Sequence, residues 1–241
     1  MFCVDTTLPT PQENLALEEA LLDAAEEGET GDVLRFWEPS EYAVVVGYAN
    51  RAGAEVNLDY CRKVGIPVLR RCTGGGTVLQ GPGVLNYTLI LRIDPQGPTH
   101  SITSTNHYVM NRQCEALTGL LRKAVQVRGH TDLAIDNLKF SGNAQRRKRN
   151  YLIFHGAFLL DLDLELVEKT LLMPSKQPDY RLNRSHTGFL MNLACPPAEV
   201  KTALRLAWDA TRISQEIPSE RVADLVRGKY SLDTWNLRIY L

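Results

Sequence analysis

The sequence predicts an α+β fold, in which a mixed β-sheet is flanked by helices. Runs of β-forming residues follow one another through short turns, as in hairpins, more often than through helices. That order differs from the regular alternation of strand and helix that builds a parallel sheet. No internal repeat or clear linker divides the 241 residues, so a single domain, residues 1–241, is predicted. Residues from about 190 to 241 are expected to form a C-terminal helical extension of it.

The first element expected is a helix that begins at Thr10. Thr10 and Glu13 form a capping-box pattern, and Pro11 suits the first helical position. Leucines then recur at helical spacing, and acidic residues occupy what is expected to be the solvated face. Gly28 and Gly31 end the helix.

Strands are expected next at residues 33–37, stopped by Pro39, and at residues 42–47, which have the pattern of a fully buried strand. Asn57 is expected to cap a short helix that Gly65 closes. The remaining elements are expected, in order, as strands at 64–69 and 84–91, a helix at 101–125, strands at 132–135, 138–145 and 151–160, and helices at 164–173, 197–211 and after 218.

The composition is that of a globular enzyme, since hydrophobic residues make up 44% and charged residues 23% of the chain. A net charge of −1 argues against a general nucleic-acid binder, which needs a strongly basic field. No apolar run reaches the length of a membrane span, and Asp5 interrupts the stretch where a secretory signal would be apolar. A cytoplasmic protein without nucleic-acid or membrane partners is therefore expected.

The five cysteines are scattered along the chain, and no two of them form a CxxC pair. An odd number of isolated thiols is typical of a reduced intracellular protein. Neither a disulfide framework nor a zinc site is expected.

A glycine-rich loop, Arg-Arg-Cys-Thr-Gly-Gly-Gly-Thr-Val at residues 70–78, lies between two strand patterns. Glycines permit positive φ angles and let a ligand approach the backbone N–H groups, which can form a nest for anionic oxygens. Arg70 and Arg71 add permanently charged forks for phosphate or carboxylate. The loop lacks the Gly-Lys-Ser/Thr ending of a Walker loop, and no helix follows it. A glycine-rich hairpin with solvent-exposed arginines is the alternative.

A second candidate site combines Asp132, Lys139 and Gly142 on two neighbouring short elements. Lys139 stands between Leu138 and Phe140, so its stem is expected to be shielded and its ammonium to need an anionic partner. A phosphate or a developing oxyanion would serve, and Asp132 could hold a divalent cation. A structural salt bridge between Asp132 and Lys139 explains the pattern at least as well.

Three stretches together resemble the superfamily of lipoate–protein ligases, octanoyltransferases and biotin ligases. The glycine-rich loop is similar to the lipoate ligases' R-R-x-S/T-G-G-G-x-V, and residues 132–142 are similar to their N-D-L…K-x-x-G-x-A. Residues 154–161 resemble the H-G-T-L-L-L strand, and residues 14–22 and 46–50 also fit. The resemblance runs from about residue 10 to 195 and indicates a short form of the lipoate–protein ligase A family.

The resemblance implies a catalytic core like that of the class II aminoacyl-tRNA synthetases. It also implies a ligase that uses ATP and Mg²⁺ to join lipoate (or octanoate) to AMP, with lipoyl-AMP as the intermediate and pyrophosphate as the leaving group. The acyl group would then pass to a lysine of a lipoyl domain, in a 2-oxoacid dehydrogenase or another lipoyl-carrier protein.

The resemblance also implies roles for single residues. Lys139 would be the catalytic residue, near the acyl carbonyl and the α-phosphate, and Asp132 would bind Mg²⁺. Trp37 would line the acyl tunnel and His155 would contact the ligand, although burial in the core explains both residues about as well. The predicted substrate and nucleotide site comprises Arg70, Arg71, Thr73, Gly74, Gly75, Gly76, Thr77, Val78, Asp132, Ser141, Gly142, Asn143, Ala144, His155 and Trp37.

Two positions depart from the family pattern, with Thr131 where Asn is common and Gln80 where many ligases have His. These departures bear on the expected adenine and metal contacts. The chain is also expected to end before the C-terminal accessory domain of the larger ligases. A separate accessory protein would then complete adenylation, or preformed lipoyl-AMP would be the substrate.

The main alternative is acyl transfer from an acyl carrier protein through a cysteine thioester, which needs an activated thiol. In the cysteine-using relatives that thiol lies near the loop before the H-G strand, and here residues 145–151 contain no cysteine. Cys72 lies inside the glycine-rich loop, and Ala194-Cys195-Pro196 is a poor match to the Pro-Cys-Gly of another transferase class.

A non-catalytic binder of a lipoyl domain or nucleotide is the third possibility. The joint presence of Arg71, the glycines and Lys139 argues against it. The basic residues 146–149 are expected to form a solvated turn, which could also steer acidic lipoyl domains.

Overall fold

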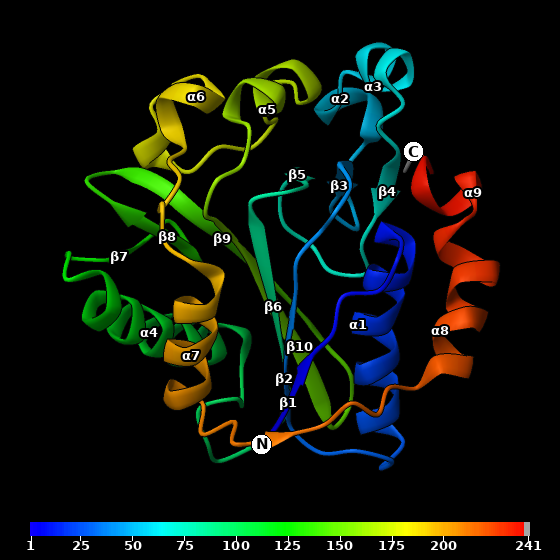
Figure 1. The fold of residues 1–241 in the computed structure, drawn as a ribbon, viewed down its shortest axis with the longest axis vertical. Helices are drawn as coiled ribbons and strands as arrows, with labels where there is room; N and C mark the ends of the chain where they lie inside the picture. Colours follow the sequence, from blue (N-terminus) through cyan, green and yellow to red (C-terminus); the bar gives the residue numbers. More distant parts are fainter. Residues whose placement is uncertain (239–241) are drawn as a thin grey trace.

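The computed structural model describes residues 1–238, which form an eight-stranded sheet, a small three-stranded sheet and the helices around them (Figure 1). The order of strands in the main sheet is β11-β1-β2-β6-β10-β9-β8-β7. Their bounds are β11 (Arg212–Ile213), β1 (Phe2–Asp5), β2 (Val33–Trp37), β6 (Val84–Arg92), β10 (Tyr151–Leu159), β9 (Leu138–Arg147), β8 (Asp132–Ile135) and β7 (Gln126–Arg128). Strands β11, β1 and β2 pair in parallel and the others antiparallel, which confirms the predicted α+β fold with a mixed sheet.

The small sheet has β3 (Ala43–Val46) at its centre, with β4 (Val68–Arg70) parallel on one side and β5 (Val78–Gln80) antiparallel on the other. The alternative drawn from the sequence, a glycine-rich hairpin with solvent-exposed arginines, is therefore wrong, and both arginines are buried. The two strands that flank the loop do not pair with each other, because β3 lies between them. The loop instead spans the end of β3, and the chain enters the main sheet only at β6.

The helices begin and end largely where the sequence indicates. Thr10 accepts a hydrogen bond from the Glu13 N–H at 3.2 Å and the Glu13 carboxylate accepts one from the Thr10 N–H at 2.9 Å, as the capping box predicts. Gly65 ends its helix with a φ of 74°. The helices are α1 (Pro11–Glu26), α2 (Ala52–Glu55), α3 (Leu58–Val64), α4 (Ile102–Leu121), α5 (Leu164–Thr170), η1 (Asp179–Arg181), α6 (His186–Phe189), α7 (Pro197–Ala207), α8 (Ser219–Leu225), the π-helical η2 (Val226–Tyr230) and α9 (Asp233–Asn236).

Two layers of helices cover the main sheet (Figure 1). Leu85, Tyr87 and Leu89 of β6 pack with α4 and α7 on one face, whereas Ile90 and Ile153 pack with α1 on the other. A third apolar cluster joins the small sheet to α5. The side chains that β9 and β10 direct toward α1 therefore lie between the main sheet and the small sheet.

Three short strands of the main sheet were not expected from the sequence, namely β7 at one edge and β1 and β11 at the other. Strand β1 precedes the first predicted helix, and β11 pairs with it from within the C-terminal extension that was expected to be helical. None of the helices within residues 1–238 is both long and apolar enough to cross a membrane.

Candidate functional site

Arg71 lies beneath the glycine-rich loop and stabilises the conformation of the loop through hydrogen bonds. Its guanidinium donates hydrogen bonds to the carbonyl oxygens of Gly74 and Gly76 at 2.5 and 2.7 Å, and its Nε donates to the Thr73 hydroxyl at 3.1 Å. The side chain is buried, and burial lowers the pKa of Arg71 to about 10. Arg71 is therefore still charged at neutral pH, and its positive charge lies directly under the loop.

The three glycines leave their backbone donors open. Gly74, Gly75 and Gly76 are exposed, and their N–H groups donate to no acceptor within residues 1–238. Gly75 has a φ of 86°, and a Cβ there would lie 2.9 Å from Nη2 of Arg71 and 3.4 Å from Cβ of Ala144. The loop thus rests on β9 with these N–H groups open, and an anion bound to them as in a nest stays a prediction.

Arg70 contacts a different part of the chain. Its guanidinium donates to the carbonyl oxygens of Gly47 at 2.8 Å, Asn50 at 2.7 Å and Trp235 at 3.1 Å. Asn50 in turn donates from its side chain to the carbonyl oxygen of Gly75 at 3.1 Å. Arg70 thereby ties the segment beside the loop to α9, and its contact with a ligand stays a prediction.

A buried chain of hydrogen bonds runs from α1 to the loop. Nδ1 of His155 lies 2.6 Å from Oε2 of Glu18, and Nε2 of His155 lies 2.6 Å from the Thr73 hydroxyl. Trp37 Nε1 and the Thr88 hydroxyl donate to the other Glu18 oxygen at 2.9 and 2.8 Å. Two predicted residues, His155 and Trp37, are thus brought together by Glu18, a residue that the sequence analysis missed.

Glu18 stays ionised in this position. Burial alone would raise its pKa, but His155, Arg35 and the Trp37 indole more than offset that effect, and the pKa falls to about 2. Because a carboxylate can only accept, the hydrogen between Glu18 and His155 is carried by Nδ1. Glu18 lies within residues 14–22, which resemble the family, but that stretch also contains Glu19, and nothing in the sequence distinguished the two carboxylates.

The second candidate site centres on Lys139. Its Nζ lies 2.7 Å from Oδ1 of Asp132, and the hydroxyl of Tyr180 donates to Oδ2 of Asp132 at 2.9 Å. A Cβ on Gly142 would lie 2.9 Å from Nζ of Lys139, so the glycine leaves room for the ammonium. The salt bridge that the sequence left as an alternative is present, with a tyrosine added to it.

Strand β9 brings the two candidate sites together. Gly142 contacts Lys139 and Ala144 contacts Gly75, so the ammonium and the glycine-rich loop lie along one face of this strand. Asn143 points to the other face, where its Oδ1 accepts from the Tyr87 hydroxyl at 2.6 Å. Ser141 is buried on that same face, so these two predicted residues lie away from the loop.

The two positions that depart from the family pattern are both hydrogen-bonded. Gln80 exchanges two side-chain hydrogen bonds with Asn86, each 2.9 Å long. The Thr131 hydroxyl donates to the Asn143 carbonyl oxygen at 2.8 Å.

Two further predicted site residues follow the glycines. Val78 packs against the core beside α1, and the hydroxyl of Thr77 is buried without a hydrogen-bond partner within residues 1–238.

The donors for a metal ion are few. Within the described part of the chain no three His, Cys, Asp or Glu side chains are grouped so that they could hold a metal. Mg²⁺ commonly takes only one or two protein carboxylates and fills its other positions with water and phosphate oxygens. Asp132 offers one such carboxylate, and a Mg²⁺ ion there would share it with Lys139 on Oδ1 and Tyr180 on Oδ2.

None of the five thiols is activated. Burial raises the pKa of Cys3, Cys61, Cys72, Cys114 and Cys195, and that of Cys72 reaches about 11.

The basic residues before β10 are largely paired, with Arg146 bonded to Glu19 at 2.8 Å and Lys148 to Asp23 at 2.6 Å.

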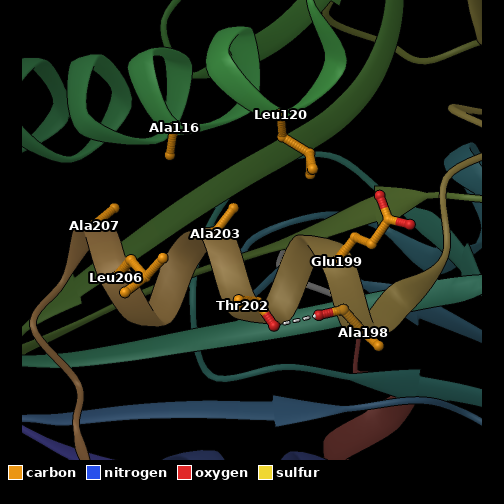
Figure 2. A pocket seen from close by; sticks show the side chains of 8 residues that line it. All are labelled: Ala116, Leu120, Ala198, Glu199, Thr202, Ala203, Leu206 and Ala207. Carbon is orange, nitrogen blue, oxygen red and sulfur yellow. Dashed lines mark hydrogen bonds between the residues drawn. The ribbon is translucent and has the colours of Figure 1, made fainter.

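Two hollows lie away from these residues. A groove of about 660 Å³ runs between α4 and α7, lined mainly by small and apolar side chains such as Ala116, Leu120 and Leu206 (Figure 2). It lies on the face of the sheet opposite the glycine-rich loop. A second hollow of about 440 Å³ includes Asp161 and Cys195. Because the charged and hydrogen-bonding groups converge elsewhere, neither hollow marks the candidate site.

Comparison with known proteins identifies the family to which the chain is similar. The model of the lipoyl protein ligase A/B catalytic domain matches residues 10–201. The chain is 28% identical over 240 residues to lipoate-protein ligase A subunit 1 of Thermoplasma acidophilum, covering 93% of this chain and 91% of that protein. It is 25% identical over 270 residues to octanoyltransferase LipM of Brevibacillus brevis, covering 97% of each.

A solved structure of a bi-partite lipoate protein ligase and its E2 lipoyl domain, from Thermoplasma acidophilum, has the same fold. The TM-score is 0.82 at 24% sequence identity, over 100% of this chain and 97% of that chain. The resemblance drawn from the sequence motifs is thereby confirmed, and so is the predicted fold class.

Proposed function

Because the chain belongs to the lipoyl protein ligase A/B catalytic domain family, we propose that it is a lipoate–protein ligase that activates lipoate with ATP and transfers the lipoyl group to a lysine of a lipoyl domain. The observation that carries this proposal is the arrangement along β9. Lys139 and the glycine-rich loop lie on one face of that strand, so a cation and open N–H groups face the same space. An acyl-adenylate needs both, since its phosphate and carbonyl oxygens are adjacent.

In the first half-reaction, a carboxylate oxygen of lipoate attacks the α-phosphorus of ATP, and pyrophosphate leaves. The N–H groups of Gly74, Gly75 and Gly76 bind phosphate oxygens. Arg71 keeps the loop in this conformation through its hydrogen bonds to the loop's carbonyl oxygens. Lys139 stabilises the charge that builds up between the carboxylate and the α-phosphate. Asp132 would hold Mg²⁺, which would neutralise phosphate charge when bound.

In the second half-reaction, the neutral amine of the acceptor lysine attacks the carbonyl carbon of lipoyl-AMP, AMP leaves, and the nitrogen releases a proton to solvent as the amide forms. The mixed anhydride already carries the activation, so no protein nucleophile is needed. Lys139 again stabilises developing negative charge, which in this step lies on the carbonyl oxygen. The acceptor is the lipoyl domain of a 2-oxoacid dehydrogenase or another lipoyl carrier in the cytoplasm.

The second candidate is a transferase without its own adenylation step. The similarity to an octanoyltransferase favours it, but the thioester route requires a reactive thiolate and burial raises the pKa of every thiol in this chain. Transfer from preformed lipoyl-AMP does not need a thiolate. The relative named as subunit 1 supports a separate accessory protein that completes adenylation here too.

The test supplies three donors to the same apo lipoyl domain and follows the mass of the acceptor. We expect a lipoyl adduct with lipoate, ATP and Mg²⁺, and also with synthetic lipoyl-AMP. An adduct from lipoyl-AMP alone would assign adenylation to an accessory protein. An octanoyl adduct from octanoyl carrier protein without ATP would overturn the ligase proposal in favour of the transferase.

A further inference from the structure

Tyr180 is the third member of the group around Lys139. Its hydroxyl donates to Oδ2 of Asp132 at 2.9 Å, while Oδ1 of the same carboxylate lies 2.7 Å from Nζ of Lys139. The two oxygens of Asp132 are therefore held from opposite sides. The tyrosine comes from η1, more than forty residues along the chain from Asp132, so the contact exists only in the folded protein.

Several independent contacts fix the ring of Tyr180. It packs on Phe189 with a centroid separation of 5.1 Å, and the guanidinium of Arg128 lies over its face at 5.3 Å. Arg184 donates to the backbone carbonyl oxygen of Tyr180 at 3.0 Å. A Cβ on Gly129 would lie 3.8 Å from Cε1 of Tyr180, so the ring packs beside the turn between β7 and β8. The hydroxyl is thus directed at Asp132 by its surroundings.

The segment that carries Tyr180 is also bound to Lys139 through the backbone. The N–H of Met191 donates to the carbonyl oxygen of Lys139 at 2.9 Å. The chain from η1 to Met191 therefore contacts Asp132 by a side chain and Lys139 by the main chain. A shift of this segment would move both members of the ion pair.

A lysine ammonium sits on a flexible four-carbon stem, so its position depends on what it is paired with. We propose that Tyr180 is a positioning residue, which holds the Asp132 carboxylate and through it places the Lys139 ammonium over Gly142. The inference rests on the proposed function, because it assigns Tyr180 a role in the reaction that Lys139 supports. Removal of the hydroxyl frees Asp132 to rotate, and Lys139 then follows it away from the acyl carbonyl.

The alternative is that Tyr180 only packs η1 against the sheet. Tyr180→Phe separates the two possibilities, since the ring contacts with Phe189 and Arg128 remain and only the hydroxyl is lost. Tyr60→Phe is the matched control, because Tyr60 lies in α3 and its hydroxyl makes no hydrogen bond within residues 1–238.

Single-turnover transfer from synthetic lipoyl-AMP to a lipoyl domain is the first measurement. For Tyr180→Phe we expect the rate constant to fall by about 10-fold, because a misplaced catalytic group is costly, while the lipoyl-domain concentration that gives half the maximal rate stays unchanged. In a Lys139→Ala background the same change should alter the rate by less than about 2-fold, since residues that act as a unit are not additive. An unchanged rate, or an equal loss in both backgrounds, would overturn the inference.

A crystal structure of Tyr180→Phe without substrates supplies a readout that does not depend on activity. We expect the Asp132 carboxylate to have turned and Lys139 Nζ to have left its place beside Gly142. An ion pair unchanged from that of the wild type would refute the inference. If the wild-type protein transfers no acyl group from any donor, the proposed function fails, and this structure still decides whether Tyr180 positions Lys139.

Discussion

Nδ1 of His155 and Oε2 of Glu18 lie 2.6 Å apart, with both side chains almost fully withdrawn from water. A buried carboxylate is costly unless charges and hydrogen bonds compensate it. Here the imidazole, the Trp37 indole and the Thr88 hydroxyl supply that compensation. Glu18 is therefore the anchor of the hydrogen-bond chain that ends at Thr73 in the glycine-rich loop.

This pair predicts a specific pH dependence of stability. The pKa of Glu18 is about 2, below its ordinary value of 4.5, so the unfolded chain takes up that proton more readily than the folded protein. The stability that ionised Glu18 supplies is fully present above pH 4.5 and is lost as the pH falls toward 2. Urea unfolding across that window should show the decline in the free energy of unfolding.

Glu18→Gln should flatten that decline, because the titrating group is gone. The variant should also lose on the order of 2 kcal/mol at neutral pH, since a neutral amide replaces an ionised acceptor in a buried network. Glu41→Gln, at an exposed position, is the control and should retain the wild-type pH profile. A profile for Glu18→Gln that parallels the wild type would contradict the assignment.

Gly75→Ala should damage the loop, whereas Gly74→Ala and Gly76→Ala should not. Gly75 has a φ of 86° and a Cβ there would crowd Arg71, but a Cβ at either neighbour meets no atom within 4 Å. The left-handed backbone costs an alanine roughly 1–2 kcal/mol. We expect the affinity for lipoyl-AMP, measured by calorimetry, to fall by about 10-fold for Gly75→Ala. The Tm should fall for this variant and stay unchanged for Gly74→Ala and Gly76→Ala.

Gly142→Ala should displace Lys139 without unfolding the protein. The new methyl group would meet the end of a flexible side chain, Nζ at 2.9 Å and Cε at 3.0 Å, and such an atom can move. We expect an unchanged Tm together with a transfer rate lowered by about 10-fold or more, because small misplacements of a catalytic group are costly. Gly53→Ala, which has open space around it, should change neither quantity.

Lys139→Ala should lower the rate of transfer from lipoyl-AMP by about 10²–10³-fold, the usual effect of removing a donor at a developing negative charge. Lys139→Arg should recover only part of that rate, since a larger planar guanidinium would replace the compact ammonium beside Gly142. Circular dichroism should show both variants folded. Transfer at the wild-type rate would mean that Lys139 is a structural partner of Asp132 and nothing more.

Arg70→Met should destabilise the protein by several kcal/mol. Arg70 is fully buried and donates to carbonyl oxygens from two distant segments, which methionine would leave unpaired. Arg51→Met, at an exposed position nearby in the sequence, should be nearly neutral. Thermal unfolding of the two variants compares the effects directly, and equal Tm values would show that Arg70 does not join the segments.

Local signals in the sequence predicted the elements well. The capping box at Thr10, the left-handed Gly65 and the strand at residues 33–37 depend on neighbouring residues, so they can be recognised without the fold. The pairing of strands cannot be recognised in this way. Nothing local indicates that β3 separates β4 from β5, or that the short β1 and β11 complete the edge of the main sheet.

The residues of the candidate site show the same difference between local sequence signals and tertiary contacts. The glycine-rich loop and the spacing from Asp132 to Gly142 lie within short stretches, and the structure packs the loop against β9, the strand that carries Lys139 and Gly142. Glu18 and Tyr180 escaped detection because their partners lie 137 and 48 residues away. Among several acidic residues of one amphipathic helix, only tertiary packing distinguishes Glu18.

The three tryptophans sit where they can report optically on these regions. The Trp37 indole is bonded to Glu18, and the Trp235 indole donates to the Arg70 carbonyl oxygen at 2.9 Å. Trp208 packs in the core beside α4, on the far face of the sheet, and can act as an internal reference. Variants that keep a single tryptophan each would therefore separate the effects of a ligand on these regions by intrinsic fluorescence. A change at Trp37 would report on the hydrogen bonds around Glu18, and a change at Trp235 would report on the contact between α9 and Arg70.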